Sequence, residues 1–282
     1  MTSISLNISG KISAESVEIC TAVREVCLEQ EIPYVIVGAS ARDMVLHYGY
    51  GAKIQRATSD LDFGIQVSDW AAFGLLKAEL VSRGFRETKT EHRVISPSNI
   101  QVDIVPFGEL EDGAANIRLP PKGDFVMNVL GFSEACETAE LIRVQDDPEV
   151  DVPVATPPGV AILKIIAWAD RDTDLRNKDA RDLSYLLTTY DKVPAISTNL
   201  YEKTEVMERY DWDVELAGAY QLGVDSRSMA QEATAQAILS LLEDRHPKLD
   251  RDRLIGEMGG HSPDTFERAQ ELIEAYKAGF VS

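Results

Sequence analysis

Residues 58–65 of the chain read T-S-D-L-D-F-G-I, which has the alternation of a β-strand. Successive side chains of a strand point to opposite faces, so Leu61 and Phe63 share one face. Asp60 and Asp62 share the other, about 6 to 7 Å apart along the strand. Two like charges at that distance repel each other, and burying either is costly without a compensating cation. A divalent metal would supply that cation, whereas on a solvated strand edge the pair would bind nothing.

A strand and a turn of small residues precede this stretch. Residues 34–43 read Y-V-I-V-G-A-S-A-R-D, an apolar run ending at Gly38 that predicts a strand buried on both faces. We expect a helix to follow from Ser40 to about Tyr48. A turn of small residues before a helix offers backbone N–H groups and a positive helix end to a phosphate.

A third carboxylate lies on a later strand. Residues 91–96 and 99–108 both have strand patterns, and Pro97 and Ser98 between them are typical of a hairpin turn. Asp103 alternates with apolar residues in the second of these strands, so it lies on the face opposite the apolar one. Several carboxylates held rigidly together are what phosphoryl transfer with two metal ions requires.

The remaining pattern divides the chain into two parts. Helices are predicted for residues 13–30 and for about 70–84, and a further strand for 141–144. After T-P-P-G at 156–159 the pattern is helical almost to the end of the chain. We therefore predict an α+β fold with a mixed β-sheet and flanking helices in a domain of residues 1–150, and an all-helical domain of residues 151–282.

Composition limits the class of protein. Of the 282 residues, 44% are hydrophobic and 27% charged, which is typical of a soluble globular protein. We find neither a membrane-spanning run nor a signal peptide, so we expect a cytoplasmic protein with no membrane partner. Cys20 and Cys27 would lie about 10 Å apart along one helix, too far for a disulfide. The net charge of -19 argues against a broad nucleic-acid surface.

The turn and the three carboxylates together resemble the DNA polymerase beta-like nucleotidyltransferase superfamily. That superfamily has a Gly-Gly or Gly-Ser turn, then Asp-x-Asp, then a distant third Asp. The turn here is Gly-Ala-Ser, with one small residue more than Gly-Ser. The matching residues are Gly38, Ala39, Ser40, Asp60, Asp62 and Asp103.

The chain resembles one branch of the superfamily more closely. Arg56 and Thr58, followed by D-L-D-F at 60–63, match the R-x-T-x-D-L-D-F string of the AbiEii-type nucleotidyltransferases, the toxins of some abortive-infection toxin-antitoxin systems. That branch also has a helical Lys followed by K-D-x-x-D-L, which Lys164 and residues 178–183 match. The resemblance covers roughly residues 33–190. It implies a nucleotidyltransferase fold for the N-terminal domain.

The resemblance also implies roles for individual residues. Asp60 and Asp62 would hold Mg2+ or Mn2+, and Asp103 would complete the metal site and act as general base. Ser40, with the adjacent turn amides of Gly38 and Ala39, would bind the β and γ phosphates of a nucleoside triphosphate. Arg56 would also lie in the nucleotide site.

Two residues of the helical half are predicted to take part in catalysis. Lys164 would pair with a phosphate as a point charge, and Asp182 would orient it or deprotonate the acceptor. Three structural alternatives stay open. Lys164 would only extend along an amphipathic helix to solvent, Asp179 and Asp182 would be solvated, and Arg42 would form a surface pair with its neighbour Asp43. Trp168 is predicted to be a core residue rather than a base-stacking platform.

The leading interpretation is a metal-dependent nucleotidyltransferase that moves a nucleoside monophosphate from an NTP to an acceptor and releases pyrophosphate. The acceptor is left open among a tRNA or other RNA end, a small molecule and a protein side chain, and the toxin-like branch implies an antitoxin partner. The alternative is a catalytically idle domain that binds nucleotide or a partner protein. Three grouped acids argue against it, because an idle site has no reason to keep their repulsion.

Overall fold

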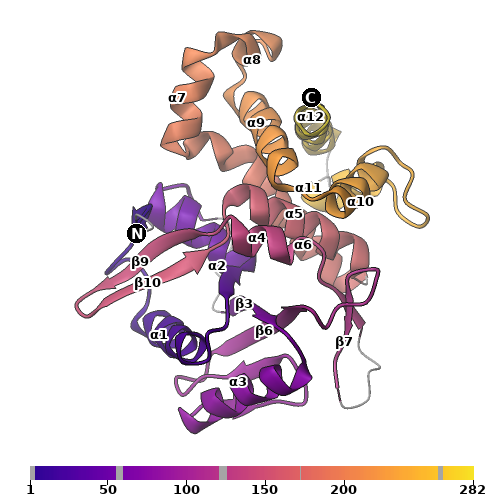
Figure 1. Ribbon diagram of the computed structural model, residues 1–282. Coiled ribbons are helices and arrows are strands. Elements are labelled where there is room, and N and C mark those ends of the chain that lie inside the picture. Colours follow the sequence, from indigo (N-terminus) through magenta and orange to yellow (C-terminus); the bar gives the residue numbers. More distant parts are fainter. Residues whose placement is uncertain (1–3, 55–59, 121–125, 172, 260–262) are drawn as a thin grey trace. The chain divides into compact units, whose positions relative to one another are not determined.

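The computed structural model of the protein describes residues 4–54, 60–120, 126–171, 173–259 and 263–282 (Figure 1). Contacts within the chain divide it into two compact units. The first comprises Met1–Gly49 and Arg56–Thr156, and the second comprises Tyr50–Gln55 and Pro157–Ser282.

The first unit is built on a mixed sheet of eight strands among the described residues. Its order is β1-β9-β10-β2-β3-β6-β5-β4. The pairs β1–β9, β10–β2 and β3–β6 are parallel, and the other neighbours are antiparallel. The strands are β1 Leu6–Asn7, β2 Tyr34–Val37, β3 Leu61–Val67, β4 Arg86–Glu87, β5 Arg93–Ile95, β6 Gln101–Gly108, β9 Glu140–Asp146 and β10 Glu149–Val154. A separate two-stranded antiparallel sheet pairs β7 Asn116–Arg118 with β8 Val126–Asn128.

Helices flank this sheet. They are α1 Ala14–Glu29, α2 Gly38–Arg42, the π-helical segment η1 Asp43–Gly49, α3 Trp70–Ser82 and α4 Phe132–Glu137. The predicted start of the first helix is confirmed, because the Ser13 side chain accepts a hydrogen bond from the Ser16 amide. Asp69 caps α3 in the same way, through the Ala72 amide. Arg83, just after α3, forms ion pairs with Glu25 and Glu29 of α1, so the two helices lie side by side.

The predicted apolar face of the aspartate strand is confirmed. Leu61, Phe63 and Ile65 are all buried. On the other face, a Cβ added to Gly64 would lie 2.8 Å from the Phe132 ring, so α4 packs closely there and only a glycine fits. The strand begins at Leu61 rather than before Asp60, because pairing with β6 starts at Leu61 and pairing with β2 starts one residue later.

The segment after β2 differs from the prediction in two respects. The helix begins at Gly38 instead of Ser40 and continues through η1. Arg42 and Asp43 are only 2% and 3% exposed, so the expectation of a surface pair is wrong. The Arg42 Nε donates to Asp43 Oδ1 at 2.8 Å. This pair is buried because α2 packs against β2 and β3.

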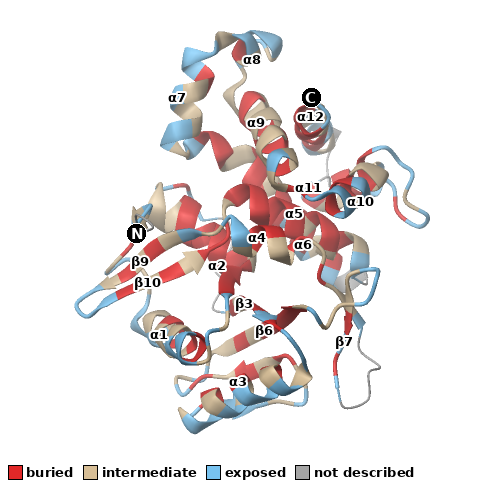
Figure 2. Ribbon diagram, viewed as in Figure 1, coloured by how far each residue is buried: buried red, intermediate tan, exposed pale blue. Residues whose placement is uncertain are grey.

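Helices are the only regular elements among the described residues of the second unit, in agreement with the predicted helical second half of the chain. α5 is buried on nearly all sides (Figure 2), and none of the described helices is both long and apolar enough to cross a membrane. The helices are α5 Pro157–Asp170, α6 Thr173–Thr189, the 3-10 turn η2 Tyr190–Lys192, α7 Pro194–Glu202, α8 Thr204–Arg209, α9 Val214–Met229, α10 Glu232–Leu242, α11 Arg251–Gly259 and α12 Pro263–Phe280.

Two packing devices hold these helices together. Trp168 of α5 is fully buried, and its Nε1 donates to Glu257 Oε2 of α11 at 2.7 Å, which confirms the prediction of a core residue. Helices α9 and α12 meet through glycines. A Cβ on Gly223 would lie 2.0 Å from the Tyr276 carbonyl oxygen, so the two backbones pack directly against each other.

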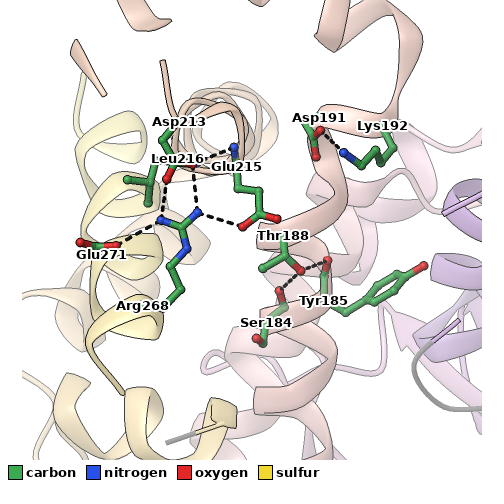
Figure 3. Close-up of polar contacts among 10 residues, drawn as sticks. All are labelled: Ser184, Tyr185, Thr188, Asp191, Lys192, Asp213, Glu215, Leu216, Arg268 and Glu271. Carbon is green, nitrogen blue, oxygen red and sulfur yellow. Dashed lines mark hydrogen bonds and ion pairs between the residues drawn. The ribbon is translucent and has the colours of Figure 1, made fainter. Parts of the chain in front are cut away.

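Arg268 of α12 joins that helix to the start of α9 (Figure 3). Its NH1 and NH2 donate to the two carboxylate oxygens of Asp213 at 2.8 and 2.9 Å, and NH2 also donates to Glu215 at 2.9 Å. Asp213 also accepts from the amides of Glu215 and Leu216 and so caps α9. Chiefly because Arg268 donates to it, the pKa of Asp213 lies below its ordinary value.

We expect the Asp213 contacts to make stability depend on pH in acid. A carboxyl whose pKa is lowered by folding contributes stability that is present above its unfolded pKa of about 3.9, and loses it as pH falls through the folded value. Asp213→Asn keeps a good capping residue and removes the charge. Urea unfolding at pH 6, 5, 4 and 3 should therefore show a smaller loss of stability in Asp213→Asn than in wild type. Equal losses would contradict this explanation.

Candidate active site

The backbone of Gly38 lies against the carboxylate of Asp62. Val37, the last residue of β2, is in register with Asp62 of β3, and the chain then turns at Gly38 with φ of +70°. A Cβ on Gly38 would lie 2.2 Å from Asp62 Oδ2. Two reasons therefore require glycine at position 38. Its φ is positive, and the Asp62 carboxylate occupies the space that a Cβ would need. Ser40 is buried, and its Oγ donates to the Val37 carbonyl at 3.1 Å.

Asp62 and Asp103 lie directly opposite each other on neighbouring strands. Parallel strands β3 and β6 pair in a register that matches Asp62 with Asp103. Strands are about 4.8 Å apart and paired residues point to the same face, so the two carboxylates lie on one surface of the sheet. Asp60 is exposed and lies one residue before β3. The sequence predicted an acid on each of these strands, and the register of β3 with β6 brings the two acids to one surface.

Arg93 extends this row of side chains by one strand. It is paired with Asp103 in the antiparallel register of β5 and β6. Its Nε donates to Asp103 Oδ1 at 2.6 Å and its NH2 donates to Oδ2 at 2.8 Å. The hydrogen-bonded carboxylate of Asp103 raises the pKa of Arg93, partial burial opposes this, and the charges of Asp60 and Asp62 add to the rise. All three aspartates thus act on one guanidinium.

Arg93 was not predicted as a site residue, although the sequence contains a signal for it. The hairpin turn was predicted correctly, and antiparallel pairing around it matches residue 95 with 101, 94 with 102 and 93 with 103. Counting back from the turn would have placed an arginine opposite the third aspartate.

The donor set suits a hard divalent cation, but its arrangement does not yet form a metal cage. Carboxylate oxygens are the ligands that Mg2+ and Mn2+ prefer. Within the part of the chain that the structure describes, however, no three His, Cys, Asp or Glu side chains come together as a metal-binding group. Both oxygens of Asp103 are engaged by Arg93. The residue types fit a divalent metal, with a guanidinium beside them as the present countercharge.

In the second unit, Lys164 lies in a buried ion network with residues of α6. Its Nζ is 2.9 Å from Asp179 Oδ1 and 2.7 Å from Asp182 Oδ2. Arg171 reaches the other oxygen of Asp179 at 2.8 Å. Burial acts to lower the pKa of Lys164, but the two carboxylates together outweigh it, so the pKa lies above its ordinary value.

The structural alternatives for this network are therefore wrong. The side chains of Asp179 and Asp182 are 1% and 3% exposed and that of Lys164 is 11% exposed. The acids are not solvated, and the lysine does not extend to solvent. Asp179 and Asp182 are three positions apart, so they share one face of α6, and that face meets α5. Arg56, which was expected near the nucleotide, and Thr58 of the same motif lie outside the described residues.

A family model described as nucleotidyl transferase AbiEii toxin, Type IV TA system, matches residues 25–275. The chain belongs to this family. The predicted resemblance is thereby confirmed, and the AbiEii-family protein is a nucleotidyltransferase. No curated protein matches it in sequence.

Several solved structures are similar to this AbiEii-family chain. The antibiotic-resistance factor ANT(2'')-Ia is 14% identical with a TM-score of 0.39, over 71% of this chain and 98% of that one. The Thermotoga maritima CCA-adding enzyme complexed with tRNA is 14% identical with a TM-score of 0.26, over 96% and 82% of the two chains. The Bradyrhizobium diazoefficiens CD-NTase CdnG in complex with GTP is 15% identical with a TM-score of 0.31, over 96% and 87%.

The contact between Gly38 and Asp62 gives a matched test. We expect Gly38→Ala to lower nucleotide transfer by about 10²-fold, because the added Cβ would displace Asp62 and misplacement by about 1 Å can cost that much. Gly10→Ala is the control, since Gly10 has φ of +72° and nothing within 4 Å of its added Cβ. Both variants carry a cost of about 1–2 kcal/mol for the positive φ. Equal activity of the two variants would show that Asp62 is not displaced or not required.

Proposed function

We propose that this AbiEii-family nucleotidyltransferase uses Mg2+ or Mn2+ and moves a nucleoside monophosphate from an NTP to an acceptor, with release of pyrophosphate. The observation that carries the proposal is the juxtaposition of Asp62 with Asp103 on β3 and β6, with the backbone of Gly38 against the Asp62 carboxylate. It brings an acidic pair and a glycine turn to the same place on the sheet. Such a site can position a triphosphate and an attacking group together.

Asp60, Asp62 and Asp103 are the proposed metal ligands. The cation, when bound, would neutralise the negative charge of the phosphate oxygens. Asp103 is also the proposed general base: its carboxylate would accept the proton of the acceptor hydroxyl, which the site must bring within about 3 Å. Strands β3 and β6 hold the carboxylates of Asp62 and Asp103 in place, whereas Asp60 lies one residue before β3.

Backbone amides are the proposed phosphate ligands of the turn. A hydroxyl carries one proton, and that of Ser40 is already donated to the Val37 carbonyl. The amides of Gly38, Ala39 and Ser40 therefore supply the hydrogen bonds to the β and γ phosphates in this proposal. Arg56 remains a proposed nucleotide ligand on the strength of the family motif alone.

Lys164 and Asp182 remain proposed catalytic residues of the second unit. An ammonium has three N–H donors, and Asp179 and Asp182 engage two of them. A phosphate could therefore take only one direct hydrogen bond from Lys164. In this proposal Asp182 fixes the direction in which the ammonium points.

The proposed biological role is that of a toxin controlled by an antitoxin, as the family description implies. The acceptor can be an RNA or tRNA end, a small molecule or a protein. The test incubates purified protein and Mg2+ with each α-labelled NTP and with separate pools of RNA, protein and small-molecule acceptors. Label in one pool identifies the acceptor class. Nucleotide binding without label in any pool would instead support the idle domain.

A further inference from the structure

Arg93 is a cationic side chain beside Asp103, one of the three proposed metal ligands. The row across the sheet reads Arg93 on β5, Asp103 on β6 and Asp62 on β3, each directly opposite the next. Residues paired in this way point to the same face. The side chain of Asp103 is only 15% exposed, and two short hydrogen bonds join it to Arg93.

This contact has consequences for any cation that approaches Asp103. A bidentate Arg–carboxylate pair fixes the carboxylate geometrically as well as electrostatically. Arginine does not lose its proton in proteins, so the guanidinium cannot release Asp103 by neutralising itself. It must move away, and a divalent cation close to Asp103 would also repel it. Arg93 has room to move, because its side chain is 32% exposed.

We propose that Arg93 is a positioning residue that holds Asp103 before the metal binds and competes with the divalent cation for this carboxylate. This inference rests on the proposed function, in which Asp103 completes the metal site. Binding of the cation and release of Asp103 from Arg93 are then two parts of one equilibrium. Asp103 becomes available as a metal ligand and as a general base only in the loaded enzyme.

The opposite role predicts the opposite result. If Arg93 only oriented Asp103 toward the cation, its removal would weaken metal binding, since the ligand would lose its support. If Arg93 competes, its removal strengthens metal binding. The sign of the change in Mn2+ affinity therefore separates competition from support, and it is measured without any turnover.

The test is calorimetric titration of Mn2+ into the full chain without nucleotide. We expect Arg93→Ala to bind Mn2+ about tenfold or more tightly than wild type. Arg86→Ala is the control for charge, because Arg86 is an arginine of the neighbouring strand β4 that contacts Asn99 instead of an acid. It should change the affinity by less than about twofold. Arg93→Gln, which keeps a polar side chain and loses the charge, replaces the alanine variant if that variant does not fold.

A double mutant shows whether Arg93 acts through Asp103. In an Asp103→Asn background, Arg93→Ala should add little to the Mn2+ affinity, because the competition has already been removed. Unchanged or weaker Mn2+ binding by Arg93→Ala overturns the inference, as does an equal gain in both backgrounds.

Asp62→Asn separates failure of this inference from failure of the proposed site. Loss of Mn2+ binding in Asp62→Asn with no effect of Arg93→Ala overturns the competition alone. Wild-type Mn2+ affinity in Asp62→Asn overturns the proposed metal site and the competition together. If neither wild type nor Arg93→Ala binds Mn2+, the proposed metal site and the competition are likewise both overturned.

Discussion

Replacing Asp62 by Asn is expected to lower nucleotide transfer by about 10²-fold or more while leaving the protein folded. A loss of this size is typical when one preorganised electrostatic group is removed from an active site. Asn has nearly the same shape as Asp, so the close contact with the Gly38 backbone is preserved. What changes is the charge in the row formed with Asp103.

Melting curves distinguish a metal ligand from a structural acid. Asp62 lies one strand from Asp103 and two strands from Arg93. When no metal is bound, removing its negative charge therefore relieves more repulsion than it loses attraction, so Asp62→Asn should melt at or above the wild-type temperature without Mg2+. The stabilisation that wild type gains from Mg2+ plus NTP should shrink, because it follows ligand affinity.

The control for Asp62→Asn must lie away from buried contacts. Asp43 is unsuitable because it is buried with Arg42. Asp147→Asn removes the same charge from an exposed residue between β9 and β10 and should leave transfer unchanged. If Asp62→Asn melted lower without metal and still transferred nucleotide, the aspartates would be structural partners and the proposed function would be wrong.

The parts of the fold that were predictable from sequence have strong local signals. Residues 34–37 are a continuous apolar run, and they form a strand whose four residues are all buried. α1 and α3 begin at capping residues, apolar residues recur at helical spacing in α1, and Gly84 follows α3, so both helices were expected close to their observed ends. Such signals do not depend on what the element packs against.

The strands that were missed lack such signals. β7 and β8 are three residues each, too short for a period to be read. β10 contains Pro153, and proline within a run argues against a strand. β10 can include Pro153 because β10 pairs with β2 only at Val154. On its other edge, β10 pairs with β9 along its whole length. These short or proline-containing segments form strands because other strands pair with them, and the pairing partners cannot be identified from one sequence.

Burial of charge was the second property that sequence could not give. Asp179 and Asp182 occur in K-D-A-R-D-L, which reads as a solvated helix face. They are buried because Lys164 and Arg171 meet them from across the α5–α6 interface. A helical pattern in the sequence predicts each helix separately. This network forms only when α5 and α6 pack against each other.

We expect Lys164→Met to lower the free energy of unfolding by about 3–5 kcal/mol. Removing one partner of a buried ion pair leaves the other charge uncompensated in a region of low dielectric, and losses of this size are typical. Asp182, whose side chain is 3% exposed, would lose the ammonium 2.7 Å away. Asp179 would keep its contact with Arg171.

Two comparisons make this prediction specific. Lys178→Met removes an exposed lysine from the same helix, α6, and should change stability by less than about 0.5 kcal/mol. Lys164→Met combined with Asp182→Asn removes both charges of one pair and should recover part of the loss. Urea unfolding of the four proteins, including wild type, measures these differences. A Lys164→Met variant as stable as Lys178→Met would show that the network contributes no net stability.

The outcome decides how loss of activity in a Lys164 variant can be interpreted. A loss of 3–5 kcal/mol is a large share of the roughly 5–15 kcal/mol that stabilises a typical domain, so reduced transfer could reflect unfolding alone. Lys164→Arg keeps the charge beside Asp179 and Asp182 and tests the chemistry separately. If that variant is stable but transfers poorly at a temperature where it remains folded, Lys164 acts on the substrate. If stability and transfer fall together, the network supports the fold and catalysis needs no direct contact with Lys164.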